Sequence, residues 1–277
     1  AQADLYEYAT PTGGYRYIGW NQRRDGEPTF FADTRVRQAM TLLTNRDEMA
    51  EQLMQGLATV ATGPFNPLGK QTDPEIEAWP YNPDRAKQLL AEAGFEDRDG
   101  DGVLENEAGE PFRFKLIYPS GSANYKQMAF YLKDALARAG VVLEPTPLEW
   151  NTMIQRINER EFDAITLGWT GNIEGDPKQI FHSDSIAAGG SNYISYANPE
   201  LDTLIDEARE TLDEDKRLAM WRQVHRILHE DQPYTFLFFR KAVLFIDKRI
   251  RNVQITRTGM NDRVEMYVPT KEQLWSE

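Results

Sequence analysis

The sequence contains no cysteine. This absence excludes disulfide frameworks, thiolate zinc sites, iron–sulfur clusters and cysteine nucleophiles together. Nor does it contain an apolar run close to the roughly 20 residues that a membrane-spanning helix needs. Its first residues, AQADLY, have neither the basic nor the apolar stretch of a signal peptide. A mature secreted protein and an internal piece of a longer chain would both begin in this way.

Positive charge is scarce. The chain has 31 Lys and Arg residues against 44 Asp and Glu residues, for a formal net charge of −13. Because such a chain repels both a phosphate backbone and an anionic membrane surface, we expect no nucleic-acid partner and no membrane docking by charge. A length of 277 residues, with 40% hydrophobic and 11% aromatic residues, is instead typical of a folded protein with a substantial core.

The common catalytic and nucleotide-binding motifs are also missing. The sequence has no G-x-S-x-G, no Walker A loop and no G-x-G-x-x-G. His225 and His229 have the helical i, i+4 spacing of a zinc site, but Arg226 stands where zinc hydrolases need Glu. We interpret these two as polar surface histidines, and His182 has no identifiable acid or nucleophile partner. The sequence therefore predicts a protein without enzyme activity and without a cofactor.

One acidic segment has the opening of a calcium loop. Asp97, Asp99 and Asp101 are followed by Gly102, which gives the D-x-D-x-D-G pattern that converges carboxylates on a hard cation. However, the twelfth position of the loop is Ala108, where an EF-hand needs a bidentate Glu. We keep the three aspartates as weak calcium candidates and favour a solvated acidic turn.

The periodicity of apolar residues predicts strands that alternate with helices. Strands are expected at 15–20, 112–118, 141–145, 162–169, 234–239 and 242–246, and helices after Asp33 and at 46–57, 84–93, 125–139, 150–158, 199–211 and 215–230. Prolines and glycines make 63–83 a long loop, which is usually functional or packed over something. The pattern predicts an α/β protein with a mixed sheet flanked by helices.

Aromatic residues beside polar turns mark the predicted binding site. Trp169 ends a predicted strand and is followed by the polar, glycine-containing turn 170–177. An α/β sheet usually presents groups to a ligand at such a point. Trp150 opens a predicted helix in a similar setting. The alternative is that both indoles only fill the core.

Several segments, in order along nearly the whole chain, resemble one known family. They are DTRVRQA at 33–39 with NR at 45–46, YNPDRAKQLLAEAGF at 81–95, FDAITLGW at 162–169, NPELD at 198–202 and QPY at 232–234. Together they resemble the C-terminal half of the family 5 extracellular solute-binding proteins. These are the peptide- and nickel-binding receptors of ABC importers.

The resemblance implies a lobe of the periplasmic-binding-protein type II kind. Members of the family have two lobes joined by a hinge, and the ligand is enclosed between them. By this resemblance residues 1–19 come from the hinge and the N-terminal lobe, 20–236 form the large C-terminal lobe, and 237–277 return towards an N-terminal lobe that is missing here. The implied partners are a peptide or small-molecule ligand, the membrane permease of an ABC transporter and that N-terminal lobe. The implied location is periplasmic or extracytoplasmic, with or without a lipid anchor.

The resemblance also implies a ligand site, with one departure. Trp169 matches the Trp of the family's turn after the strand. In peptide binders the acid three residues later pairs with the α-ammonium group of the peptide, and here that position is Asn172. A neutral amide loses the charge-assisted part of the bond, which is roughly twice as strong as a neutral bond. Glu174 or Asp176 would then have to supply the charge.

Two further aromatic residues complete the implied site. Trp150 matches an aromatic residue that lines the pocket of oligopeptide binders, and Tyr125 is placed where a polar residue faces it. The predicted ligand contacts are Trp169, Thr170, Gly171, Asn172, Asp176, Trp150 and Tyr125.

Three functions remain open from the sequence. The first is an oligopeptide-binding component of an ABC importer, and the second is an oligosaccharide receptor of the same family, which Asn172 makes reasonable. The third is a secreted hydrolase or calcium-dependent carbohydrate module. A hydrolase needs two carboxylates about 5 to 9 Å apart across a cleft, and sequence alone does not show such a pair.

Overall fold

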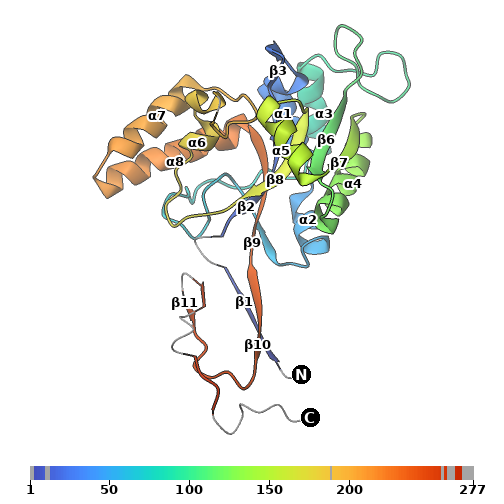
Figure 1. Ribbon diagram of the computed structural model, residues 1–277. Helices are drawn as coiled ribbons and strands as arrows, with labels where there is room; N and C mark the ends of the chain where they lie inside the picture. The colour runs from blue at the N-terminus through green and yellow to red at the C-terminus, as the bar shows by residue number, and fades with distance from the viewer. Residues whose placement is uncertain (1–2, 10–12, 188, 257–258, 261–265, 270–277) are drawn as a thin grey trace.

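A six-stranded mixed sheet, in the order β5-β9-β2-β8-β6-β7, organises most of the chain (Figure 1). This computed structural model describes residues 3–9, 13–187, 189–256, 259–260 and 266–269. Strand β6 runs parallel to β7 and β8, whereas the other neighbouring strands are antiparallel. The strands are β2 (Tyr15–Trp20), β5 (Ala58–Val60), β6 (Arg113–Pro119), β7 (Val142–Leu148), β8 (Ala164–Trp169) and β9 (Tyr234–Arg240). The predicted mixed α/β fold is confirmed.

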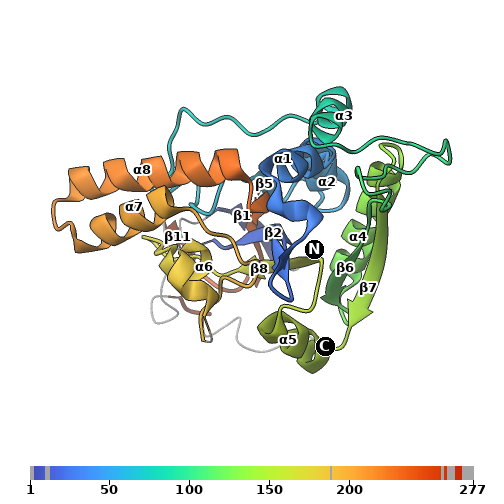
Figure 2. The same ribbon diagram turned by 90° about the horizontal axis from the view of Figure 1, so that it is seen from above.

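Helices cover both faces of this sheet (Figure 2). One core lies between the sheet and α1 (Thr34–Leu42), α2 (Arg46–Gln52), α3 (Pro83–Glu92) and α4 (Ala123–Ala137). The second lies between the sheet and α5 (Trp150–Glu159), α6 (Lys178–Phe181), α7 (Pro199–Glu210) and α8 (Glu214–Asp231). Side chains alternate between the two faces of a strand. On β2, Ile18 and Trp20 therefore join the first core, and Tyr15 and Tyr17 the second.

Except for α6, whose N-cap is Pro177, the α-helices begin where the sequence offers a side-chain cap. Asp33 accepts a hydrogen bond from the backbone N–H of Arg35, 2.8 Å away, which confirms its predicted role at the start of α1. Helix α2 ends at Gln52, earlier than predicted, because Gln55 and Gly56 adopt positive φ angles of 55° and 73°. Helix α6 and strand β5 were not predicted, since four and three residues are too few to show a period.

Short elements complete the chain, and one of them, the turn that contains Phe31, contributes to the first core. They are the hairpins β3 (Arg23–Arg24) with β4 (Glu27–Pro28) and β11 (Ile255–Thr256) with β12 (Gly259–Met260), and the 3-10 turns at Phe30–Ala32 and Ser183–Ile186. Among the described residues, none of the helices combines the length and the apolar character needed to cross a membrane.

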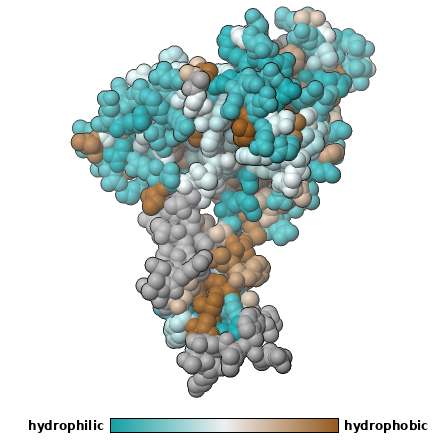
Figure 3. Space-filling view, in the orientation of Figure 1, coloured by the Kyte–Doolittle hydropathy of each residue, from teal (hydrophilic) through white to brown (hydrophobic). Residues whose placement is uncertain are grey.

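A two-stranded ribbon extends away from the body (Figure 1). It pairs β1 (Ala3–Tyr8) with β10 (Ala242–Asp247) in antiparallel register. Leu5 and Phe245 are opposite each other and are 60% and 76% exposed, so the ribbon carries hydrophobic surface, as Figure 3 shows. Parts of the segment 237–277, namely 257–258, 261–265 and 270–277, lie outside the described residues.

Candidate ligand-binding site

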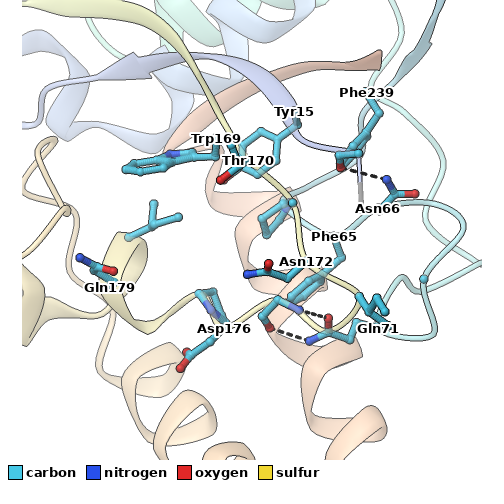
Figure 4. A pocket seen from close by; sticks show the side chains of 18 of the residues that line it. Tyr15, Phe65, Asn66, Gln71, Trp169, Thr170, Asn172, Asp176, Gln179 and Phe239 are labelled. Atoms are coloured by element: carbon cyan, nitrogen blue, oxygen red, sulfur yellow. Dashed lines mark hydrogen bonds between the residues drawn. The ribbon is translucent and has the colours of Figure 1, made fainter. Parts of the chain in front are cut away.

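A hollow of about 270 Å³ lies at the edge of the sheet where β8 and β9 end and β2 begins (Figure 4). Two segments enclose it, the turn at 170–177, here called the β8 turn, and the loop at 61–73, here called the facing loop. Its lining comprises Gly13 and Tyr15, residues 64–66, 69 and 71 of the facing loop, 169–173 and 175–177, 179–181 of α6, and Phe239. The β8 turn is the segment that the sequence predicted to contact a ligand.

The strand register explains why three aromatic side chains meet at this edge. Tyr15 is opposite Trp169 on one side and Phe239 on the other, because β2 lies between β8 and β9. All three residues line the hollow. Tyr15 is 5% exposed, and its buried hydroxyl has no hydrogen-bond partner among the described residues. Burial raises the pKa of Tyr15, so the hydroxyl keeps its proton at neutral pH.

Trp169 belongs to a stack of four nearly parallel rings. Its ring centroid is 6.4 Å from that of Tyr193 and 6.3 Å from that of Tyr17, and Tyr17 is 4.0 Å from Tyr234. The interplanar angles along the stack are 13°, 8° and 11°. Trp169 is therefore packed against the second core and also lines the hollow. The indole therefore fills part of the core and also faces the hollow, where the predicted ligand contact would be.

The carboxylate of Glu174 is directed at the helices behind the β8 turn. Its Oε1 accepts hydrogen bonds from Arg217 Nε at 2.7 Å and from Trp221 Nε1 at 3.3 Å. Both partners belong to α8. Glu174 is not among the residues that line the hollow.

Asp176 lines the hollow, but both of its carboxylate oxygens are engaged elsewhere. Oδ2 accepts from Arg209 Nε of α7 at 2.9 Å, and Oδ1 accepts from the backbone N–H of Lys178 at 3.0 Å. In Figure 4 the carboxylate lies at the side of the view where the helices run. Both acids of the turn therefore already have an arginine as their charge partner.

A side-chain amide joins the facing loop to the β8 turn. Gln71 Nε2 donates to the carbonyl oxygen of Gly175 at 2.8 Å, and Gln71 Oε1 accepts from the N–H of Gly175 at 2.6 Å (Figure 4). Asn66 supports the same loop, because its Nδ2 donates to the carbonyl of Gly13 at 3.0 Å and its Oδ1 accepts from the N–H of Leu68 at 3.0 Å. These amides organise the hollow, and their polar groups are already paired.

Two histidines of α8 hold the facing loop from behind, and the interpretation of them as surface residues was wrong. His225 and His229 are 0% and 9% exposed. His225 Nδ1 accepts from the N–H of Asp73 at 3.0 Å, so its Nε2 carries the proton and faces Thr62 Oγ1 at 3.1 Å. His229 Nδ1 donates to the carbonyl of Thr62 at 2.8 Å. Burial, with a smaller effect from His229, lowers the pKa of His225 to about 4.

A glycine permits this close contact between loop and helix. A Cβ on Gly63 would lie 2.4 Å from His225 Cδ2, which is closer than side chains allow. The buried guanidinium of Arg46 joins the start of the facing loop to β9 and to the chain that follows the loop. It donates to the carbonyls of Ala61 at 3.0 Å, Phe236 at 2.8 Å and Trp79 at 2.6 Å. The facing loop is thus attached to both α2 and α8.

The structure brings together five of the seven predicted ligand contacts. Trp169, Thr170, Gly171, Asn172 and Asp176 all line the hollow. Trp150 and Tyr125 do not line it, although both follow strands that end at the same sheet edge. Trp150 is 52% exposed at the start of α5, and Tyr125 is 7% exposed with the Arg16 guanidinium 4.7 Å from its ring centroid.

The sequence did not identify the rest of the lining, above all Phe65, Gln71, Gln179 and Phe239. The proline-rich loop at 63–83 was the available signal for Phe65 and Gln71, because loops of that length are usually functional. Gln179 lies on the four-residue helix α6, which gave no periodic signal.

The predicted calcium loop folds as an exposed acidic turn outside the hollow. Asp97 accepts from the N–H groups of Gly100 and Gly102, Asp99 from Asp101, and Asp101 from Val103. Among the described residues, carboxylate oxygens of Asp97, Asp99 and Glu105 come within 4.8 Å of one another, so Glu105 takes the place expected for Asp101. The aspartates bond mainly to the backbone of their own turn.

Comparison with known proteins gives a matching family model and several relatives. The family model described as "Bacterial extracellular solute-binding proteins, family 5 Middle" matches residues 1–192. The chain is 34% identical over 229 residues to the oligopeptide-binding protein AppA of Bacillus subtilis, covering 81% of this chain and 41% of that protein. It is 30% identical over 220 residues to heme-binding protein A of Haemophilus influenzae, covering 79% of this chain and 38% of that protein.

A solved structure agrees with the sequence comparison. The solved structure of the oligopeptide-binding protein AppA of Bacillus subtilis, in complex with a nonapeptide, superposes with a TM-score of 0.84 at 28% identity. The match covers 97% of this chain and 53% of that one. The chain therefore spans about two fifths of the length of these curated relatives and about half of the solved one.

Proposed function

The chain belongs to the family 5 bacterial extracellular solute-binding proteins, and on that premise we propose that it is the ligand-binding lobe of an ABC-importer receptor. Its cargo would be an oligopeptide or a similar small solute, captured outside the cytoplasm and passed to a membrane permease. The observation that carries this proposal is the hollow at the end of β8, which combines aromatic side chains with a polar turn. Such a combination binds a small ligand and orients it.

Binding without chemistry is part of the same proposal. A glycoside hydrolase needs two carboxylates across its cleft. Among the described residues, the hollow is lined by a single carboxylate, that of Asp176, which is paired with Arg209. Nothing in this lining favours the hydrolase alternative over a receptor.

We further propose that the ligand is enclosed when this lobe closes against a second, N-terminal one. The sequence suggested 20–236 for the lobe, with 1–19 and 237–277 as connections. Strands β2 and β9 cross these boundaries within the sheet, so we draw the lobe from the start of β2 to the end of β9. The ribbon of β1 and β10 would be the connection, and its exposed Leu5 and Phe245 offer apolar surface for packing against the second lobe.

Native mass spectrometry of the natural full-length protein, purified gently, tests the cargo. Bound masses that differ by amino-acid residues would support a peptide receptor. A ladder of hexose masses would support the oligosaccharide receptor instead. Repeated absence of any bound small molecule, together with no uptake of added peptide or sugar, would contradict the receptor proposal.

Replacing Trp169 tests the site. Trp169→Ala removes the indole that lines the hollow, and we expect the affinity of the full-length protein for its ligand to fall at least tenfold. Phe130→Ala, on an exposed aromatic residue of α4, is the matched control. Unchanged affinity in Trp169→Ala would show that the ligand binds elsewhere. Trp150→Ala then measures whether the ligand reaches the start of α5, as the sequence suggested.

A further inference from the structure

The charge of the hollow limits what it can receive. Among the described residues that line it, Asp176 is the one with a charged side chain. Its two oxygens accept hydrogen bonds from Arg209 Nε and from the N–H of Lys178, at 2.9 and 3.0 Å. The hollow is therefore close to neutral, although the chain as a whole carries a net charge of −13.

The polar groups that remain available to a ligand are uncharged. The amides of Asn172 and Gln179 and the hydroxyl of Thr170 are exposed and make no hydrogen bonds to the described residues. The hydroxyl of Tyr15 is buried without a partner beside the same space. By contrast, the amides of Asn66 and Gln71 are used within the protein.

These groups suit an uncharged ligand that forms hydrogen bonds. A primary amide offers both donors and an acceptor, which match the N–H and C=O groups of a peptide or the hydroxyl groups of a sugar. An ammonium group enclosed here would lose its hydration and would meet only a carboxylate whose charge Arg209 already offsets, and burying a charge without full compensation is unfavourable. The aromatic side chains of Phe65, Trp169 and Phe239 add apolar contact that does not depend on charge.

We propose that this hollow receives an uncharged, hydrogen-bonding part of the ligand and does not bind a free α-ammonium group. The fitting ligands are a peptide whose amino terminus is blocked or lies outside the hollow, and a neutral oligosaccharide. This inference rests on the proposed receptor function and specifies the substrate class of the same site. Asn172 and Gln179 are its specificity-determining residues.

The test compares three probes on the natural full-length protein by native mass spectrometry titration. They are a pentapeptide library with free amino termini, the same library after N-acetylation, and maltotriose. We expect the acetylated library to bind within about threefold of the free one, or better. Asn172→Asp places a carboxylate at the hollow. In this variant the ratio of the affinity for the free library to that for the acetylated library should rise at least tenfold. Asn158→Asp adds the same charge on the exposed surface of α5 and should leave the ratio unchanged.

The outcomes separate this inference from the receptor proposal. A wild-type preference of tenfold or more for the free library, or an unchanged ratio in Asn172→Asp, would overturn the inference while peptide binding stands. Binding of maltotriose alone would support the uncharged hollow and exclude peptide as cargo. Failure of all three probes to bind would contradict the receptor proposal and the inference together.

Discussion

The two segments that enclose the hollow are held in place by different physics. The facing loop is held by hydrogen bonds with the buried side chains of His225, His229 and Arg46. The β8 turn is joined to that loop by the two hydrogen bonds between Gln71 and Gly175, and its acids are held by two ion pairs, Glu174 with Arg217 and Asp176 with Arg209, whose carboxylates are 46% and 51% exposed. Buried polar contacts are strong because breaking them leaves unsatisfied groups, whereas exposed ion pairs contribute little and are screened by salt.

This difference predicts that the acids of the β8 turn are held more weakly than the facing loop. The groups that we assign to ligand recognition, Asn172 among them, lie on the turn that exposed ion pairs hold. The loop opposite is locked by its contacts with α8. Three experiments sharpen this contrast.

The largest effect is expected from His225→Ala. The change removes a fully buried ring and leaves the N–H of Asp73 without its acceptor, so we expect the free energy of unfolding to fall by about 3 kcal/mol. Urea denaturation followed by tryptophan fluorescence measures it. Arg222→Ala, on the exposed side of the same helix, should change stability little. Equal effects of the two changes would contradict the role given to His225.

The second largest effect is expected from acid, which should weaken the attachment of the facing loop to α8. The pKa of His225 falls from 6.5 to about 4 in the folded chain, so the unfolded chain takes up a proton first as the pH decreases. The stability that neutral His225 provides is complete above pH 6.5 and is lost as the pH falls towards 4, with about 2 kcal/mol lost at pH 5. The lowered pKa of His229 acts in the same direction.

The control for this pH effect is His225→Gln, whose amide oxygen can accept from Asp73 but does not titrate. Urea denaturation at pH 7 and pH 5 should show a smaller loss of stability in this variant than in the wild type. An equal loss in both proteins would mean that other groups, such as Asp73 or His229, cause the pH dependence.

The smallest effect is expected on the β8 turn. Glu174→Gln removes the ion pair with Arg217 but leaves an oxygen to accept from Trp221, so the Tm should fall by no more than about 2 °C. In 1 M NaCl, which screens the pair, the difference from the wild type should disappear. If Glu174→Gln lost as much stability as His225→Ala, measured in the same way, the two sides of the site would be held equally strongly.

The sequence predicted the framework of the molecule well, because its signals are local. The alternation of β2 and β6, the apolar runs of β8 and β9, the capping by Asp33 and the glycine ends of helices all depend on neighbours along the chain. The same reasoning led to the β8 turn, since a polar turn after a buried strand is visible in the letters alone.

The sequence could not show which distant side chains would be paired. Glu174 and Asp176 looked available for a ligand. Arg217, the partner of Glu174, lies 43 positions further along the chain on α8, and Arg209, the partner of Asp176, lies 33 positions further on α7. His225 looked like a surface residue because its partner in the folded chain, the facing loop, is distant in the sequence. Asp73 of that loop is 152 positions away. Burial of a polar group depends on what packs against it.

The amino-acid sequence by itself determined the family, the α/β class and the position of the β8 turn. Those properties follow from local periodicity and from short motifs in a fixed order. Only the tertiary structure decided which polar groups of the site are free and which are paired. That outcome depends on the strand register, which places Tyr15 between Trp169 and Phe239, and on the helix packing that brings Arg209 and Arg217 to the acids of the turn.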